Sequence, residues 1–293
     1  MFWIVGKEGL LAKAFQRGFI AQDLEYVASS HLECDITNLD QVEKFTSQFP
    51  IKTIINCSGY THVDFAEKEI DKAFLLNEKG VLHLAQIAKK IGAKLVHFST
   101  DYVFDGKKPS PYLETDSVDP LNTYGASKYA GELVIQQVLP SSLIIRVSWL
   151  FSKEMPAMNF TKKMVELLQI KDQLEVVEDQ VGKVTYAEDL VDATLEILAQ
   201  EGLFHYANQG VISRYEYAKE ILQVLKKLNI AVKCERILPV SSTKFPMLAK
   251  RPCYSALDTT KIEKILKKPI RHHTEALAEC LLSMASEGKI YVT

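Results

Sequence analysis

Tyr124 and Lys128 are the two residues whose types and spacing point most directly to catalysis. Residues four apart on a helix share one face, so the lysine ammonium would lie beside the tyrosine phenol. A neighbouring cation favours the phenolate and lowers the pKa of a tyrosine from its usual value of about 10. Such a tyrosine can deliver a proton to a carbonyl oxygen near neutral pH.

The Tyr-x-x-x-Lys spacing alone does not identify a site. Chance predicts about one such pair in a chain of 293 residues with 12 tyrosines and 29 lysines. The sequence contains a second pair, Tyr215 and Lys219. Context separates the two, because Tyr124 follows a predicted strand end, which is where parallel sheets bind ligands. Tyr215 and Lys219 lie far from any predicted strand end, and we interpret them as a surface pair.

That strand end carries the second candidate group, Ser99-Thr100-Asp101-Tyr102. Hydroxyl groups at a strand terminus can hydrogen-bond the carbonyl oxygen of a substrate. The alternative interpretation is a strand end followed by a turn, because Asp105-Gly106 is a turn signal. The residues alone leave these two interpretations equally open.

The third candidate is a loop of small residues, Gly6-x-x-Gly9-x-x-Ala12, between a predicted strand and a predicted helix. Small residues let the backbone N–H groups of the helix start approach a pyrophosphate. This context favours a dinucleotide loop over an ordinary strand-helix turn. No carboxylate follows the second predicted strand in residues 28–31, so NADP is permitted, although no arginine stands there to hold its phosphate. Asp35 comes late for the ribose and could instead contact the adenine edge or cap the next helix.

The elements that must position these residues alternate along the first half of the chain. Short unalternated apolar runs predict strands buried on both faces. They lie at 2–5, 24–27, 53–56, 95–98 and 143–147. Amphipathic stretches predict helices between them, at 11–17, 39–49, 64–76, 80–91 and 127–138. This repetition predicts an α/β fold with a doubly wound parallel sheet of the Rossmann type.

The pattern changes after Trp149. Helices are predicted at 159–168, 188–199 and 216–228, with strand-like runs at 174–177 and 203–207. We therefore expect residues 1–150 to form a dinucleotide-binding domain, to which elements near 179–208 return. Residues 151–293 are expected to form mainly a smaller C-terminal α/β substrate lobe.

Composition excludes several classes of protein. The formal net charge is −2, which gives no electrostatic case for nucleic acid as a partner. No apolar run approaches the roughly 20 residues that span a bilayer, and the apolar N-terminus is too short for a signal peptide. Five scattered cysteines fit a reducing cytoplasm. The seven histidines show no zinc spacing, so no metal site is expected.

Several ordered motifs resemble the dTDP-4-dehydrorhamnose reductase family, a group of extended short-chain dehydrogenases/reductases. The longest matching stretches are residues 56–67, 98–106 and 120–132, and shorter ones follow at 146–149, 159–160, 179–182 and 251–258. The resemblance implies binding of NADPH or NADH and reduction of the C4 ketone of a dTDP-linked 4-keto-6-deoxy sugar, giving dTDP-L-rhamnose. It also implies a cytoplasmic enzyme that can form a homodimer.

Site roles follow from the same resemblance. Thr100, Tyr124 and Lys128 match the catalytic trio, in which Tyr124 protonates the new alkoxide and Thr100 orients the carbonyl. The implied cofactor residues are Gly6, Gly9, Leu10, Leu11, Asp35, Ile36, Cys57, Ser58, Gly59, Tyr124 and Lys128. The implied substrate residues are Thr100, Asp101, Tyr102, Trp149, Asn159 and Arg251. Trp149 is expected to pack on the sugar or, alternatively, to be a core aromatic, and Lys244, Lys250 and Arg251 are candidate diphosphate partners.

Departures from the family pattern leave alternatives open. His62 stands beside the expected sugar pocket where small or apolar residues are usual, Cys57-Ser58-Gly59 replaces a run of alanines, Ala12 replaces a third glycine, and no proline precedes Thr185. None of these removes a catalytic group. One alternative is a reductase of a different nucleotide-linked 4-keto sugar. The other is a non-catalytic regulatory subunit that binds the dinucleotide, as the similar β subunit of methionine adenosyltransferase does.

Overall fold

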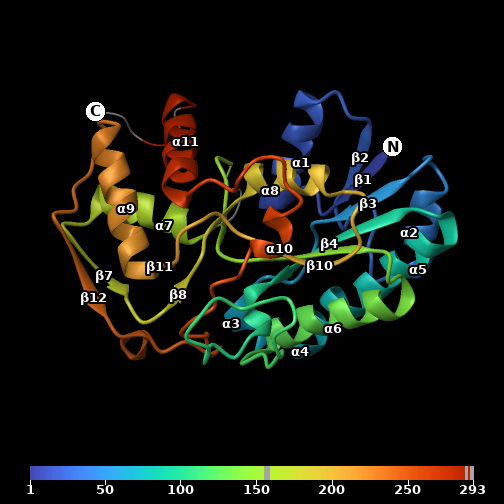
Figure 1. Cartoon of the computed structure of the whole chain (residues 1–293), viewed down its shortest axis with the longest axis horizontal. Coiled ribbons are helices and arrows are strands. Elements are labelled where there is room, and N and C mark those ends of the chain that lie inside the picture. The colour runs from blue at the N-terminus through green and yellow to red at the C-terminus, as the bar shows by residue number, and fades with distance from the viewer. Residues whose placement is uncertain (155–158, 288–289, 291–293) are drawn as a thin grey trace.

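The computed structural model describes residues 1–154, 159–287 and 290. A larger lobe surrounds a six-stranded sheet, and a smaller lobe of helices and short strands lies beside it (Figure 1). This arrangement confirms the predicted α/β fold with a doubly wound parallel sheet. Within the described residues, no helix is both long and apolar enough to cross a membrane.

All strand pairs of the central sheet are parallel. Its order is β10-β5-β4-β3-β1-β2, so the chain reverses direction across the sheet between β1 and β3. The strands are β1 (Phe2–Val5), β2 (Tyr26–Ser29), β3 (Thr53–Asn56), β4 (Lys94–Thr100), β5 (Leu143–Val147) and β10 (Gly202–Tyr206). Such a reversal creates a crevice at the carboxyl ends of the strands, where open α/β sheets bind ligands.

Helices cover both faces of this sheet. On one face α1 (Leu10–Ala21) and α8 (Ala187–Glu196) pack against apolar residues such as Ile4 and Ile55. On the other face lie α2 (Leu39–Thr46), α5 (Val81–Ile91) and α6 (Thr123–Val138), around a core that contains Trp3 and Ile54. Adjacent residues of one strand therefore belong to opposite cores, which explains why these strands are apolar at every position.

The smaller lobe has a core of its own. It is built from α7 (Phe160–Ile170), α9 (Arg214–Lys227), α11 (His273–Ser286) and the parallel pair β7 (Gln173–Val177) and β12 (Arg236–Val240). Short strand pairs lie between the lobes, namely β6 (Leu150–Phe151) with β9 (Thr185–Tyr186) and β8 (Val181–Gly182) with β11 (Ile212–Ser213). The short helix α10 (Thr260–Glu263) contacts β10 at the sheet edge.

Several predicted element bounds are wrong, among them those of the stretch 64–76, of the second strand and of the helix at 127–138. The stretch 64–76 is not one helix but α3 (Val63–Ala66), α4 (Ile70–Phe74) and a π-helical turn, Leu75–Gly80. Tertiary partners break it, because the Asp64 carboxylate pairs with Arg251 and Glu67 accepts from the backbone N–H of Thr123. The second strand starts two residues later than predicted, and the helix predicted to begin at 127 begins at 123, where Asn122 caps it.

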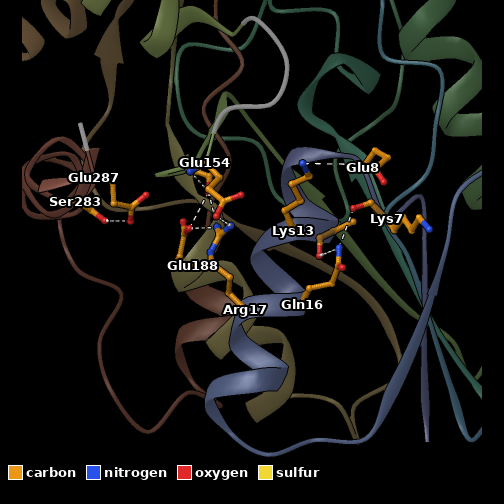
Figure 2. Close-up of polar contacts among 11 residues, drawn as sticks. Lys7, Glu8, Lys13, Gln16, Arg17, Glu154, Glu188, Ser283 and Glu287 are labelled. Carbon is orange, nitrogen blue, oxygen red and sulfur yellow. Dashed lines mark hydrogen bonds and ion pairs between the residues drawn. The ribbon is translucent and has the colours of Figure 1, made fainter. Parts of the chain in front are cut away.

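Polar contacts tie the segment after β6 to the larger lobe (Figure 2). Arg17 of α1 donates to the Ser152 hydroxyl at 3.0 Å and to Glu188 of α8 at 2.5 Å. Its other terminal nitrogen lies 3.1 Å from Glu154. These interactions hold Ser152 and Glu154 against the larger lobe.

Candidate active site

A cavity of about 670 Å³ opens at the carboxyl ends of the central strands and extends to the smaller lobe. Its wall contains all the sequence-predicted site residues except the three candidate diphosphate partners, Lys244, Lys250 and Arg251. They are Gly6, Gly9, Leu10, Leu11, Asp35, Ile36, Cys57, Ser58, Gly59, Thr100, Asp101, Tyr102, Tyr124, Lys128, Trp149 and Asn159. Residues that are far apart in the sequence therefore converge because parallel strands present their carboxyl ends at one edge.

Gly6 ends β1 with φ +83°, in the left-handed region that favours glycine. A Cβ there would lie 3.0 Å from the Cα of Ser58. Gly9 then caps the N-terminus of α1. The first N–H groups of a helix have no partner within the helix, and such groups can bind an anion. The missing side chain at Gly6 keeps open a cradle of the kind that fits a pyrophosphate.

The region after β2 is more polar than the sequence suggested. Ser30 and His31 line the cavity. The Glu33 carboxylate turns back to accept from the N–H and hydroxyl of Ser30, and Lys7 lies 2.6 Å from the same carboxylate. Asp35, farther along the wall, accepts from the N–H and hydroxyl of Thr37 and so stabilises the turn before α2.

Tyr124 lies in the first turn of α6, with its ring 5.9 Å from that of Tyr102 in an edge-on arrangement. Burial raises the pKa of the Tyr124 phenol, and the nearby Thr100 hydroxyl only partly offsets the rise. The predicted lowering of this pKa by Lys128 is therefore wrong for this structure. The phenol is therefore protonated at neutral pH and has a proton to donate, although its raised pKa makes it a weaker acid than an exposed tyrosine.

Lys128 lies one turn farther along α6 and is buried, with 5% of its surface exposed. Its Nζ donates to the carbonyl oxygen of Phe98 at 2.6 Å. Burial lowers the pKa of Lys128 to about 8, although the negative charge of Glu132 opposes the change. The ammonium is thus held by the strand that carries Thr100 rather than directed at the Tyr124 ring.

A fully buried histidine lies behind Lys128. The Ser58 backbone N–H donates to Oδ1 of Asn56, which directs the Asn56 Nδ2 toward Nδ1 of His97 at 3.0 Å. The Nε2 on the other side of the same ring lies 3.5 Å from the Nζ of Lys128. Burial keeps the pKa of His97 well below its ordinary value, so this ring is uncharged.

Asp101 controls the hydroxyl of Thr100. The Thr100 Oγ1 donates to one carboxylate oxygen at 3.1 Å, and the Ser255 hydroxyl donates to the other at 2.5 Å. Burial raises the pKa of Asp101 to about 6, and the two hydroxyls and the charge of Arg214 offset it only in part. The Thr100 hydroxyl is therefore oriented by a carboxylate that is ionised at neutral pH.

The side of the cavity formed by the smaller lobe is aromatic. Trp149 is partly buried and has φ 44°, in the left-handed region, so its backbone is strained. A Cβ on Gly182 would lie 3.0 Å from its ring, and the Arg214 guanidinium lies 3.4 Å from the centre of that ring. Asn159 caps α7 through Oδ1, while its buried Nδ2 has no hydrogen-bond partner among the described residues. Trp149 therefore belongs to the cavity wall, although Arg214 covers part of its ring.

The other candidate cations and His62 lie outside the wall. The Arg251 guanidinium pairs with Asp64 at 2.6 Å. Lys244 is exposed and pairs with Glu175, and Lys250 is also exposed. His62 is exposed beside the rings of Tyr60 and Phe65, so it is a polar side chain at the rim. In the second Tyr-x-x-x-Lys pair, the Nζ of Lys219 lies 5.2 Å from the centre of the Tyr215 ring, and Tyr215 is partly buried against the core of the smaller lobe.

Sequence reasoning missed four polar residues of this site. Arg214, Asn56 and His97 were not considered as site residues, and Ser255 was quoted only within the stretch 251–258. A lysine or arginine in the first turn of a helix opposes the helix dipole, so Arg214 at the start of α9 carried a local signal. The only sequence feature that marks Asn56 and His97 is that each is a polar residue within an otherwise apolar strand. Among the described residues, no group of three or more histidine, cysteine, aspartate or glutamate side chains could hold a metal ion.

Comparisons with known proteins agree with this geometry. The family model described as the RmlD substrate binding domain matches residues 1–286. A dTDP-4-dehydrorhamnose reductase of Aggregatibacter actinomycetemcomitans is 35% identical over 270 residues, which cover 89% of this chain and 91% of that protein.

Two solved structures are also similar. The reductase of Clostridium acetobutylicum has a TM-score of 0.90 and 33% identity, covering 97% of this chain and 99% of that one. The reductase of Bacillus anthracis, solved in complex with NADP, has a TM-score of 0.89 and 34% identity, with coverage of 96% and 98%. Since the family model spans nearly the whole chain, the protein belongs to the dTDP-4-dehydrorhamnose reductase family.

Proposed function

We propose that this protein uses NADPH or NADH to reduce the C4 ketone of dTDP-4-dehydro-L-rhamnose, which gives dTDP-L-rhamnose. The observation that carries the proposal is the position of Thr100, Tyr124 and Lys128 in one cavity that is continuous with the Gly6 loop. Relatives that are named for this reaction match the chain over nearly their whole length.

The wall fits a dinucleotide. The Gly6 cradle and the N-terminus of α1 suit the pyrophosphate, and Cys57, Ser58 and Gly59 lie where the cofactor would cross the sheet. When bound, NADPH or NADH supplies the hydride. We propose that residues 1–150, with β10 and α8, hold the dinucleotide, and that residues 151–293 mainly hold the nucleotide sugar.

Three side chains of this chain then act on the ketone. Tyr124, whose raised pKa keeps it protonated, gives its proton to the oxygen that becomes the C4 hydroxyl. Thr100 positions that oxygen for the transfer, and its hydroxyl hydrogen, which Asp101 accepts in this structure, turns to the ketone oxygen when the sugar binds. Lys128 places a positive charge beside the strand end and, in our proposal, holds the nicotinamide ribose. The low-dielectric surroundings strengthen both electrostatic effects.

The regulatory-subunit alternative is not favoured by any feature of the site, because the trio is intact and the cavity reaches the smaller lobe. A different 4-keto sugar is the remaining alternative on this fold. We also propose a cytoplasmic homodimer, which light scattering after size-exclusion chromatography would test.

The reaction is tested by following oxidation of NADPH and of NADH with dTDP-4-dehydro-6-deoxy-L-mannose, the 4-keto form of the rhamnose donor. We expect turnover and a product that co-elutes with dTDP-L-rhamnose. If the enzyme turns over only other nucleotide-linked 4-keto sugars, the proposed substrate is wrong and one of those sugars takes its place. A protein that binds the cofactor but turns over no 4-keto sugar would support the regulatory alternative.

A further inference from the structure

Arg214 is a cation in an unfavourable position. It is the first residue of α9, which the Ser213 capping box begins, and it lines the cavity. A positive side chain in the first turn opposes the helix dipole, and burial lowers the pKa of its guanidinium. Residues that oppose a local preference of this kind, here the preference for negative charge at a helix N-terminus, are expected at functional or strained sites.

Aromatic rings hold this guanidinium in one orientation. Its central carbon lies 3.4 Å from the centre of the Trp149 ring and 4.7 Å from that of Phe160. A guanidinium stacked on an aromatic face keeps its N–H groups free at the edge of the plane. Both aromatic residues line the cavity as well, so the group is fixed at the wall where a ligand would contact it.

Within residues 1–154, 159–287 and 290, the charge of Arg214 lacks a carboxylate partner. Four of the six arginines form salt bridges with carboxylates: Arg17, Arg146, Arg251 and Arg271. In the part of the chain that the structure describes, no carboxylate forms such a bridge with Arg214, and Asp101 acts on it only as a nearby charge. The lysine of the wall, Lys128, already donates to a carbonyl oxygen, and burial lowers its pKa to about 8.

The phenol of Tyr102 lies near two positive groups. Burial raises the pKa of Tyr102, and the charges of Arg214 and Arg251 both oppose that rise, so both guanidinium groups lie near this phenol. Both arginines hydrogen-bond the phenol, but Arg214 also lines the cavity, whereas Arg251 is paired with Asp64.

We propose that Arg214 binds the diphosphate of the nucleotide sugar, with its N–H edge directed at the phosphate oxygens and Trp149 serving as its support. Guanidinium groups bind phosphates with two parallel hydrogen bonds, which suits a doubly charged diphosphate. The inference rests on the proposed function, since it assigns the anionic part of that substrate. It also changes the expected role of Trp149, whose ring would hold the arginine in addition to any contact with the sugar.

The test measures binding rather than turnover. Calorimetry compares dTDP, dTMP and NADPH on the wild type and on Arg214→Gln, Arg214→Lys and Arg236→Gln. Arg236 is an exposed arginine of the same lobe and serves as the matched control. We expect Arg214→Gln to weaken dTDP binding at least 10-fold, dTMP binding less, and NADPH binding less than 2-fold. Arg214→Lys should recover part of the loss, and Arg236→Gln should match the wild type.

Two results would overturn the inference in distinguishable ways. If Arg214→Gln binds dTDP as tightly as the wild type does, Arg214 is only a counter-charge for Asp101. If the wild type itself binds NADPH but no dTDP, the proposed function fails and the inference fails with it. Unchanged NADPH binding by Arg214→Gln shows that the variant is folded, and a loss of both ligands directs the comparison to Arg214→Lys. In that case, dTDP binding by Arg214→Lys equal to that of the wild type would refute the proposal that the Arg214 guanidinium binds the diphosphate with two parallel hydrogen bonds.

Discussion

Replacement of Asp101 is expected to change the stability and the activity of this protein in opposite directions. Its side chain is buried, yet it must be ionised at neutral pH to accept from both Thr100 and Ser255. Burial raises its pKa from 3.8 to about 6, so hydrogen bonds and the charge of Arg214 do not fully offset the loss of solvation. A carboxylate in this state destabilises the fold while it serves the site.

The size of this effect follows from the pKa change. A rise from 3.8 to about 6 means that the ionised group costs about 3 kcal/mol of folding free energy at pH 8. Because the folded-state pKa is the higher one, this cost is fully present above about pH 6 and falls as the pH drops toward 3.8. At pH 5 roughly half of it remains, about 1.6 kcal/mol.

Asp101→Asn removes the charge and keeps the shape. We expect the variant to melt several degrees higher than the wild type at pH 8, and by a smaller margin at pH 5. We also expect kcat/KM to fall at least 10-fold, because Thr100 loses a charge-assisted hydrogen bond. Differential scanning calorimetry at both pH values and steady-state kinetics measure the two effects.

The control is Asp23→Asn, at an exposed position with φ 51° that asparagine tolerates. It should leave both the melting temperature and the activity close to those of the wild type. A lower melting temperature for Asp101→Asn at pH 8, or a gain that does not shrink at pH 5, would refute the reasoning that burial dominates at this carboxylate.

Two further predictions concern residues outside the cavity wall. Arg251→Ala, which frees Asp64, should raise the KM for the nucleotide sugar far more than the KM for the cofactor, and equal increases would contradict that assignment. Gly131→Ala should lower the melting temperature by several degrees, because its Cβ would lie 2.3 Å from the carbonyl oxygen of Asn77 and overpacking costs roughly 1–3 kcal/mol. An unchanged melting temperature would show that α6 and the π-helical turn have room to separate.

The fold was predictable where burial is uniform along a strand. The runs 2–5, 53–56 and 143–147 form strands with the predicted boundaries. A strand that is buried on both faces is apolar at nearly every position, and a short continuous apolar run therefore marks its two ends. The β2 boundary shifted because it includes Ser29, whose hydroxyl accepts from the Trp3 indole within the sheet. No pattern in residues 64–76 reveals that Asp64 would bind a residue far along the chain.

The site was predictable in its motifs but not in its electrostatics. The Tyr124 and Lys128 spacing and the Gly6 loop were recognisable because their chemistry depends on local geometry. The directions of the pKa changes depend on burial and on partners such as Phe98, which sequence spacing does not show. Arg214 was not predictable for the same reason, since a single arginine at a helix start does not indicate that its side chain lines a cavity.

Replacement of Tyr124 by phenylalanine tests the central claim most directly. The change removes only the hydroxyl that we propose as proton donor, and the ring should keep its edge-on contact with Tyr102. With dTDP-4-dehydro-6-deoxy-L-mannose, we predict that NADPH oxidation falls by roughly 10²-fold or more, within the range of general acid catalysis, while NADPH binding is retained. Turnover by Tyr124→Phe close to that of the wild type would contradict the account.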